Sequence, residues 1–93
     1  MDIRHDQTDS KGRYWVTAPN GDMATMTYSR AGESLIIIDH TEVPDSLRGQ
    51  GYGAALVARA VRDAREQSRR IMPLCPFAAS QFRRNADWQD VLS

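Results

Sequence analysis

Short apolar stretches separated by turn-forming residues fill the first half of the chain. Three turn clusters, at residues 9–12, 19–22 and 30–33, each place a glycine beside polar residues, a composition that favours reversal of the backbone. In the second cluster, Asn20-Gly21 is the pair that a hairpin with two positive φ angles prefers. The intervening segments are rich in residues that favour strands. The pattern predicts a meander of four antiparallel strands, at residues 3–6, 13–17, 24–29 and 34–43.

The fourth of these segments, "SLIIIDHTEV", carries the strongest strand signal because it contains three consecutive isoleucines. Its continuous apolar start predicts a central strand that is buried on both faces. Side chains alternate between the two faces of a strand. One face is therefore predicted to carry Ile36, Ile38, His40 and Glu42, and the other Leu35, Ile37, Asp39, Thr41 and Val43.

The spacing of apolar residues changes to a helical period in the second half. Between about residues 51 and 68 the apolar positions are Leu56, Val57, Ala60, Val61 and Ala64, which form one stripe along a helix. Residues 70–75 then read as a short strand, Pro76 can open a helix over 77–84, and residues 87–92 form a last turn. The order predicts a single α+β domain over residues 1–93, with a mostly antiparallel sheet, a central helix and a C-terminal helix.

Composition narrows the function classes. The 93 residues carry a formal net charge of zero, so no field of the whole molecule favours nucleic acid or membrane. The late arginines are interpreted as a solvated helix face. Cys75 is the one cysteine, which excludes an internal disulfide and suits a reducing compartment. No secretory signal begins the sequence and no apolar run approaches about 20 residues, so we expect a cytoplasmic protein.

The glycine-rich stretch "RGQGYG" at residues 48–53 precedes the central helix. A nucleotide P-loop is excluded because Ala54-Ala55 stands where Lys and Ser or Thr are required. A dinucleotide fingerprint is rejected because the stretch does not directly follow a strand and no acidic residue lies about 20 positions on. Two readings stay open: an anion site made by backbone N–H groups at the helix N-terminus, and a tight corner between strand and helix.

The stretch "VPDSLRGQGYG" followed by a helix resembles the acyl-CoA-binding signature of the GNAT acetyltransferase superfamily, [Q/R]-x-x-G-x-[G/A], through Arg48, Gly51 and Gly53. With "HTEVP" before it and "MPLCPF" after it, the chain is similar to the short GNAT-like proteins of roughly 90 residues. The likeness is good over residues 34–84. It implies a minimal GNAT-like fold that uses acetyl-CoA as a co-substrate and an unidentified amine as acceptor.

The resemblance also implies roles for particular residues. Thr41, Glu42 and Val43 would pair with the pantetheine arm and polarise the thioester carbonyl. The pyrophosphate would lie on the backbone amides of the loop, which are those of Arg48, Gly49, Gln50, Gly51, Tyr52 and Gly53. The tyrosine that often serves as general acid in the superfamily is replaced here by Phe82, which has no proton to give.

Three side chains are candidates for the chemistry. Cys75, which stands where many relatives carry asparagine, is expected to be a nucleophile, an acid or base, or a small buried hydrophobe. His40 is a candidate base because its ordinary pKa is about 6.5, and Glu42 is a candidate base or anchor for the amine. Each could equally be structural. The spacing of His5, His40 and Cys75 fits no metal site, so no metal is predicted.

Two main functions are consistent with these residues. The first is an acetyl-CoA-dependent N-acetyltransferase, with Cys75, His40 and Glu42 as its catalytic candidates. The alternative is a non-catalytic CoA or acyl-CoA-binding module whose acetyltransferase site has degenerated, which the missing tyrosine favours. An interaction domain that kept the fold and lost the ligand is a third, weaker reading. A monomer or a homodimer that binds neither nucleic acid nor membrane is expected.

Overall fold

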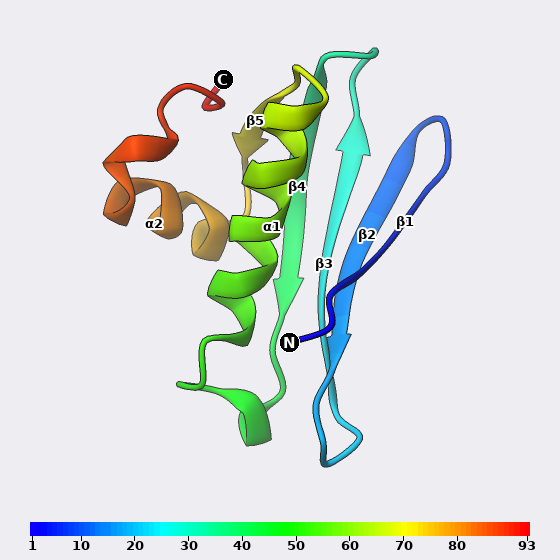
Figure 1. Cartoon of the computed structure of the whole chain (residues 1–93), viewed down its shortest axis with the longest axis vertical. Coiled ribbons are helices and arrows are strands. Elements are labelled where there is room, and N and C mark those ends of the chain that lie inside the picture. Colours follow the sequence, from blue (N-terminus) through cyan, green and yellow to red (C-terminus); the bar gives the residue numbers. More distant parts are fainter.

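The computed structural model describes residues 1–93 and confirms the predicted α+β architecture (Figure 1). Its elements are β1 (Arg4–Gln7), β2 (Lys11–Thr17), β3 (Met23–Arg30), β4 (Leu35–Glu42), α1 (Tyr52–Glu66), β5 (Arg70–Pro73) and α2 (Pro76–Arg84), with single 3₁₀ turns at Asp45–Leu47 and Ala86–Trp88. The strands form one sheet in the order β1-β2-β3-β4-β5. All neighbours are antiparallel except β4 and β5, which are joined through α1 and run parallel.

The core lies between one face of the sheet and the two helices. α1 packs on β2, β3 and β5, and α2 packs on α1, β4 and β5; Figure 1 shows α1 lying along the sheet. The predicted stripe of α1 is buried here. β4 is an inner strand between β3 and the edge strand β5, but only Ile36 and Ile38 are buried, whereas Leu35 and Ile37 are half-buried. The expectation of burial on both faces is therefore wrong, because the helices cover one face only. No helix of the protein has the length and apolarity needed to cross a membrane.

A β-bulge at Asp39 corrects the predicted alternation along β4. Ile38 pairs with Tyr28 and His40 pairs with Thr27, so Asp39 is an extra residue with no partner of its own on β3. Cross-strand partners lie on the same face of a sheet, and the bulge shifts that pairing by one position. Thr41 therefore joins Ile38 on the helix-covered face, and Asp39, His40 and Glu42 lie on the opposite, outer face.

Two glycines have special positions in the hairpins. Between β2 and β3, Gly21 has a φ of 91° while Asn20 does not have a positive φ, so the predicted turn with two positive φ angles is wrong. Gly12 on β2 lies across from Tyr28. A Cβ at Gly12 would lie 2.1 Å from Cζ of Tyr28. Glycine is needed at position 12 because the tyrosine ring occupies the space of a side chain.

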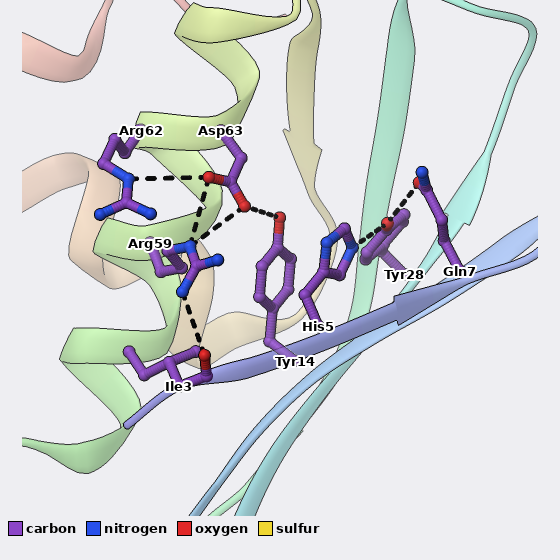
Figure 2. A network of polar contacts seen from close by, with 8 residues as sticks. All are labelled: Ile3, His5, Gln7, Tyr14, Tyr28, Arg59, Arg62 and Asp63. Carbon is purple, nitrogen blue, oxygen red and sulfur yellow. Dashed lines mark hydrogen bonds and ion pairs between the residues drawn. The ribbon is translucent and has the colours of Figure 1, made fainter. Parts of the chain in front are cut away.

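A polar network crosses the core between β2 and α1 (Figure 2). Tyr14 donates a hydrogen bond from its hydroxyl to Oδ2 of Asp63 at 2.8 Å. Arg59 donates from Nε to both oxygens of the same carboxylate at 3.2 Å, and from its NH1 group to the carbonyl of Ile3 at 3.1 Å. Asp63 is only 7% exposed. A buried charge requires partners inside the protein, and Tyr14 and Arg59 supply them.

The same network continues to the edge strand β1. His5 stacks on Tyr14, with ring centroids 4.1 Å apart and planes 6° from parallel. Its Nε2 lies 2.6 Å from the hydroxyl of Tyr28, which donates to Oε1 of Gln7 at 3.1 Å (Figure 2). Burial raises the pKa of both tyrosines and lowers that of His5. The short strand β1 is thus held to the sheet by side chains as well as by its backbone ladder.

Candidate functional site

A pocket of about 540 Å³ opens between the end of β4, the glycine loop, the first turn of α1 and one side of α2. Most of the predicted binding residues are present in its wall, which also contains residues of α2. The lining residues are Thr41, Val43, Leu47, Arg48, Gly49, Gly51, Tyr52, Gly53, Ala54, Phe77, Gln81 and Arg84.

The glycine loop beside this pocket carries a continuous row of free backbone donors. The first hydrogen bond of α1 runs from the N–H of Ala55 to the carbonyl of Gly51. The six preceding N–H groups, of residues 49–54, donate to no backbone or side-chain acceptor. Gly49 and Gly51 have φ angles of 75° and 85°, a conformation that glycine adopts without strain. Free N–H groups at the positive end of a helix dipole form an anion site.

The polar side chains of the loop are engaged within the loop itself. Arg48 pairs from Nε with Asp45 at 3.2 Å, and Gln50 donates from Nε2 to the carbonyl of Ser46 at 2.8 Å. The expected charge of Arg48 is therefore partly compensated and the side chain of Gln50 is already bonded. Arg84 contributes a cation to the pocket from the last turn of α2. The donors of the site are mainly backbone groups, supported by Arg84.

Position 53 requires glycine because neighbouring side chains fill the space that a larger residue would occupy. A Cβ at this position would lie 2.7 Å from the ring of Phe77 and 3.2 Å from a methyl group of Val43. Three segments, the end of β4, the first turn of α1 and the first turn of α2, therefore meet at one point. The last glycine of the signature serves the packing that shapes the pocket.

The strands β4 and β5 separate at the same point. Their parallel ladder ends at the pair Ile38–Pro73, and the N–H groups of Leu74 and Cys75 both donate to the carbonyl of Ile38. Beyond Ile38, no strand pairs with β4 on the side of β5. The segment 41–43 thus has an open edge that faces the pocket, with Thr41 and Val43 in its wall.

Cys75 lies where the two strands separate and α2 begins. It is the N-cap residue of α2, it is 5% exposed, and its Sγ lies 3.5 Å from Oγ1 of Thr41. Burial acts to raise the pKa of this thiol, but hydrogen bonding with the Thr41 side chain and with the backbone of Phe77 and Ala78 outweighs it, so the pKa is lowered. The surroundings therefore favour the thiolate more than an ordinary buried site does.

His40 and Glu42 are not brought together with Cys75. Both lie on the outer face, and Nε2 of His40 is 4.0 Å from Oε2 of Glu42 with both side chains more than two-thirds exposed. The backbone of residue 42 belongs to the open edge, but its side chain does not line the pocket. Their catalytic roles stay predictions, and they would require an acceptor that approaches from the outer face.

Phe82, which stands where many family members have a tyrosine, belongs to the hydrophobic core. Phe82 is 2% exposed and packs edge-on against Trp88 with ring centroids 5.4 Å apart. Phe77 and Gln81 also line the pocket, although neither was predicted as a site residue. Their spacing from Arg84, i, i+4 and i+7, places all three on one face of a helix, which was the available signal.

Comparisons with known proteins establish the family of the chain. The sequence profile of the GCN5-related N-acetyl-transferase family matches residues 13–91. The chain belongs to this family. Protein NATD1 of Gallus gallus is 28% identical over 91% of this chain and 76% of its own length, and that of Bos taurus is 29% identical over 83% and 70%. Enzymes of the GCN5-related N-acetyltransferase family use acetyl-CoA as the acyl donor.

Solved structures of the family show the same fold. The solution structure of a GCN5-like protein from Staphylococcus aureus is 33% identical, with a TM-score of 0.74 over 99% of this chain and 87% of that one. Nourseothricin acetyltransferase, at 23% identity, has a TM-score of 0.64 over 82% of this chain and 49% of its own, a likeness of fold alone. The part of that larger enzyme that aligns with this chain is about half of its length.

Proposed function

We propose that the protein is an N-acetyltransferase that holds acetyl-CoA in the pocket at the start of α1 and transfers the acetyl group to an amine. The observation that carries the proposal is the row of six free N–H groups at residues 49–54. A corner made only for chain reversal gains nothing from unpaired donors, whereas a pyrophosphate would accept several of them. The free N–H groups and the two glycines with positive φ fit this group.

The remaining parts of the donor would extend from the loop in two directions. Arg84 can reach a further phosphate, because it is the cation on the α2 side of the pocket. The pantetheine arm would follow the open edge of residues 41–43, where extended backbone offers hydrogen bonds. This path ends beside Thr41 and Cys75, whose side chains lie 3.5 Å apart. The thioester, which supplies the acetyl group, would thus be held where β4 and β5 separate.

Cys75 is proposed as the proton donor to the leaving sulfur. As the amine nitrogen bonds to the acetyl carbon, the carbon–sulfur bond breaks and its electron pair goes to sulfur. The Cys75 thiol then donates its proton to that sulfur, the nitrogen of the new amide gives up its extra proton to water, and water returns a proton to Cys75. Its lowered pKa makes the thiol a better acid than an ordinary cysteine.

His40 and Glu42 are proposed to serve the acceptor. Only an uncharged amine can attack, so the ammonium form must first lose a proton. The imidazole of His40 on the outer face is suited to accept it. The neighbouring carboxylate of Glu42 can attract the cationic amine before that transfer.

A non-catalytic acyl-CoA-binding module is the second candidate. The observation that favours it is Phe82, which is enclosed in the core at the position of the usual tyrosine acid. The two candidates share the pocket and differ only in turnover. Both place the protein among those that bind acetyl-CoA.

One experiment separates the candidates. Wild type, Cys75→Ala and Gly51→Glu are incubated with acetyl-CoA, and melting temperature, intact mass and turnover over a panel of amines are measured. We expect thermal stabilisation and turnover in wild type, and stabilisation with at least tenfold slower turnover in Cys75→Ala. Binding without turnover on any amine would favour the module. If wild type gains the mass of an acetyl group and Cys75→Ala does not, Cys75 acts as a nucleophile and not as the proton donor.

Gly51→Glu tests the loop against a matched control. A carboxylate among the free N–H groups would repel the pyrophosphate, which costs several kcal/mol and weakens binding about 100-fold or more. Gly32→Glu carries the same strain, because Gly32 also has a positive φ and open space around it. Gly32 lies in the β3–β4 turn, so its variant should bind acetyl-CoA normally. Equal binding by all three proteins would exclude the loop as the pyrophosphate site, and absence of binding by wild type would contradict both candidate functions.

A further inference from the structure

An apolar strip made by Ile37, Met72 and Leu74 runs along the outer face of β4 and β5, which the helices leave uncovered. Ile37 pairs with Met72 across the parallel ladder, and both are half-buried. Leu74 continues the strip, since its N–H donates to the carbonyl of Ile38. Leu74 is 62% exposed whereas the next residue, Cys75, is 5% exposed. Successive side chains of an extended segment point to opposite faces, so Leu74 lies on the outer face.

The strip ends at the place where β4 and β5 separate. Leu74 directly precedes Cys75 on one side of the separation, and His40 and Glu42 flank Thr41 on the other. Adjacent Cα atoms are about 3.8 Å apart, and Sγ of Cys75 lies 3.5 Å from Oγ1 of Thr41. An exposed leucine, an imidazole and a carboxylate therefore lie on the outer face, around the point proposed for the thioester.

Large apolar side chains are rarely exposed on this protein, and two of the exposed ones flank Cys75. The exposed ones are Met1, Met23, Leu74 and Phe77. Phe77 lines the pocket proposed for acetyl-CoA, which gives it a ligand to contact. Leu74 lies outside that pocket, so the acyl donor does not cover it. An apolar side chain gains stability when a ligand removes it from water, and at this place that ligand is the acceptor.

We propose that the acceptor is a primary amine with an apolar chain, which packs on the strip of Ile37, Met72 and Leu74 while its amino group meets His40 and Glu42. This inference rests on the proposed acetyltransferase function and assigns an acceptor class to it. The carboxylate of Glu42 attracts the ammonium form, and each methylene group that leaves water on the strip adds to binding. A polyamine fits less well, because its second ammonium would lose water against apolar side chains.

Three amines of matched length test the acceptor class. Hexylamine, aminopentanol and cadaverine share a chain of methylene groups that ends in a methyl, a hydroxyl and a second amino group respectively. We expect kcat/KM with acetyl-CoA to be about tenfold higher for hexylamine than for the other two. Equal kcat/KM for all three amines, or the highest value for cadaverine, would overturn the inference while the acetyltransferase function would stand.

Leu74→Ser tests the strip against a matched control. Because Leu74 is mostly exposed, the variant should melt close to wild type. Its preference for hexylamine over aminopentanol should fall to about twofold, with kcat/KM for aminopentanol unchanged. Met23→Ser removes another exposed apolar side chain at the start of β3, and it should keep the preference of wild type. An unchanged preference in Leu74→Ser, or an equal loss in both variants, would contradict the strip.

Binding without turnover separates this inference from the function on which it rests. Hexylamine is added to the protein saturated with CoA, and the methyl signals of Ile37, Met72 and Leu74 are followed by NMR. We expect saturable shifts. Such shifts in a protein that acetylates no amine would contradict the acetyltransferase function and support the strip as an amine site, whereas their absence would overturn the inference. A dimer in wild type that becomes a monomer in Leu74→Ser would overturn it in favour of a second copy of the chain.

Discussion

The glycine loop and the polar network of Tyr14, Asp63 and Arg59 differ in whether their hydrogen-bonding groups have partners inside the protein. In the network each charge is met by a partner inside the protein. In the loop six successive N–H groups have none. Satisfied groups contribute to the stability of the fold, whereas unsatisfied groups at a surface are available to a ligand. The network that stabilises the fold and the proposed ligand site would thus occupy different parts of α1.

Asp63→Ala should have the largest effect on stability. The substitution leaves the guanidinium of Arg59 and the hydroxyl of Tyr14 without their acceptor, and breaking such a buried pair costs about 3–5 kcal/mol. The free energy of unfolding is measured by urea denaturation. Asp2→Ala, which removes the partner of an exposed ion pair with Arg4, should leave it nearly unchanged. A small effect of Asp63→Ala would show that the network does not stabilise the fold.

Gly12→Ala tests the other half of the network. The new Cβ would occupy the place of the Tyr28 ring, and overpacking of this kind costs about 1–3 kcal/mol. Tyr28 would move away from His5, so the amides of β1 should exchange hydrogen faster. Affinity for acetyl-CoA should stay within about twofold of wild type, since the loop is remote. A large loss of affinity would show that the polar network and the glycine loop are not independent.

Gly53→Ala tests whether the packing around Gly53 determines the shape of the pocket. Its Cβ would collide with the ring of Phe77, so acetyl-CoA affinity should fall. Phe77→Ala removes the collision, and the double variant should be more stable than the sum of the single effects by about 1 kcal/mol. Additive effects in this double-mutant cycle would show that the contact does not shape the pocket.

The pH dependence of β1 is expected to be the smallest effect. Burial, then the nearby Arg59 and Arg69, lower the pKa of His5, while Asp63 and Asp6 act in the opposite direction. The folded state therefore prefers neutral His5. Its contribution to stability is complete above the ordinary pKa of 6.5 and is lost as pH falls through the lower pKa of the folded state.

Comparison with His5→Gln isolates this contribution from that of the carboxylates. The unfolding free energy of wild type should fall more between pH 7 and pH 5 than that of the variant. Hydrogen exchange of residues 4–7 should report where the loss occurs. Parallel pH profiles of the two proteins would contradict the role of His5.

The sequence was sufficient for features that depend on local periodicity. The stripe of α1 and the helix that opens at Pro76 were predicted correctly from the spacing of apolar residues and from proline chemistry. The strand ends were predicted to within two residues, and the last strand ends at Pro73 and not at residue 75. The family resemblance was carried by Arg48, Gly51 and Gly53, and the matching family confirms it. The free donors of the loop follow from the helix start itself.

Features that depend on pairing between distant segments could not be predicted. Nothing local marks Asp63 as the partner of Tyr14, 49 positions away. The register between β3 and β4 determines the bulge at Asp39, and a strict alternation placed Thr41 on the wrong face. The positive φ of Ser68, 54°, was also missed, because a serine after a helix gives no signal of it.

The bulge at Asp39 has a consequence for how this protein tolerates change. Replacing the side chain at position 39 alters one exposed group, and removing the residue would leave its neighbours on their present faces. His40 would still pair with Thr27 and Thr41 with Met26, so Thr41 would keep its contact with Cys75. One further residue inserted between His40 and Thr41 would instead turn Thr41 towards solvent. In this strand a residue can be lost more easily than gained. An insertion of one codon there should be far more damaging than deletion of the codon for Asp39.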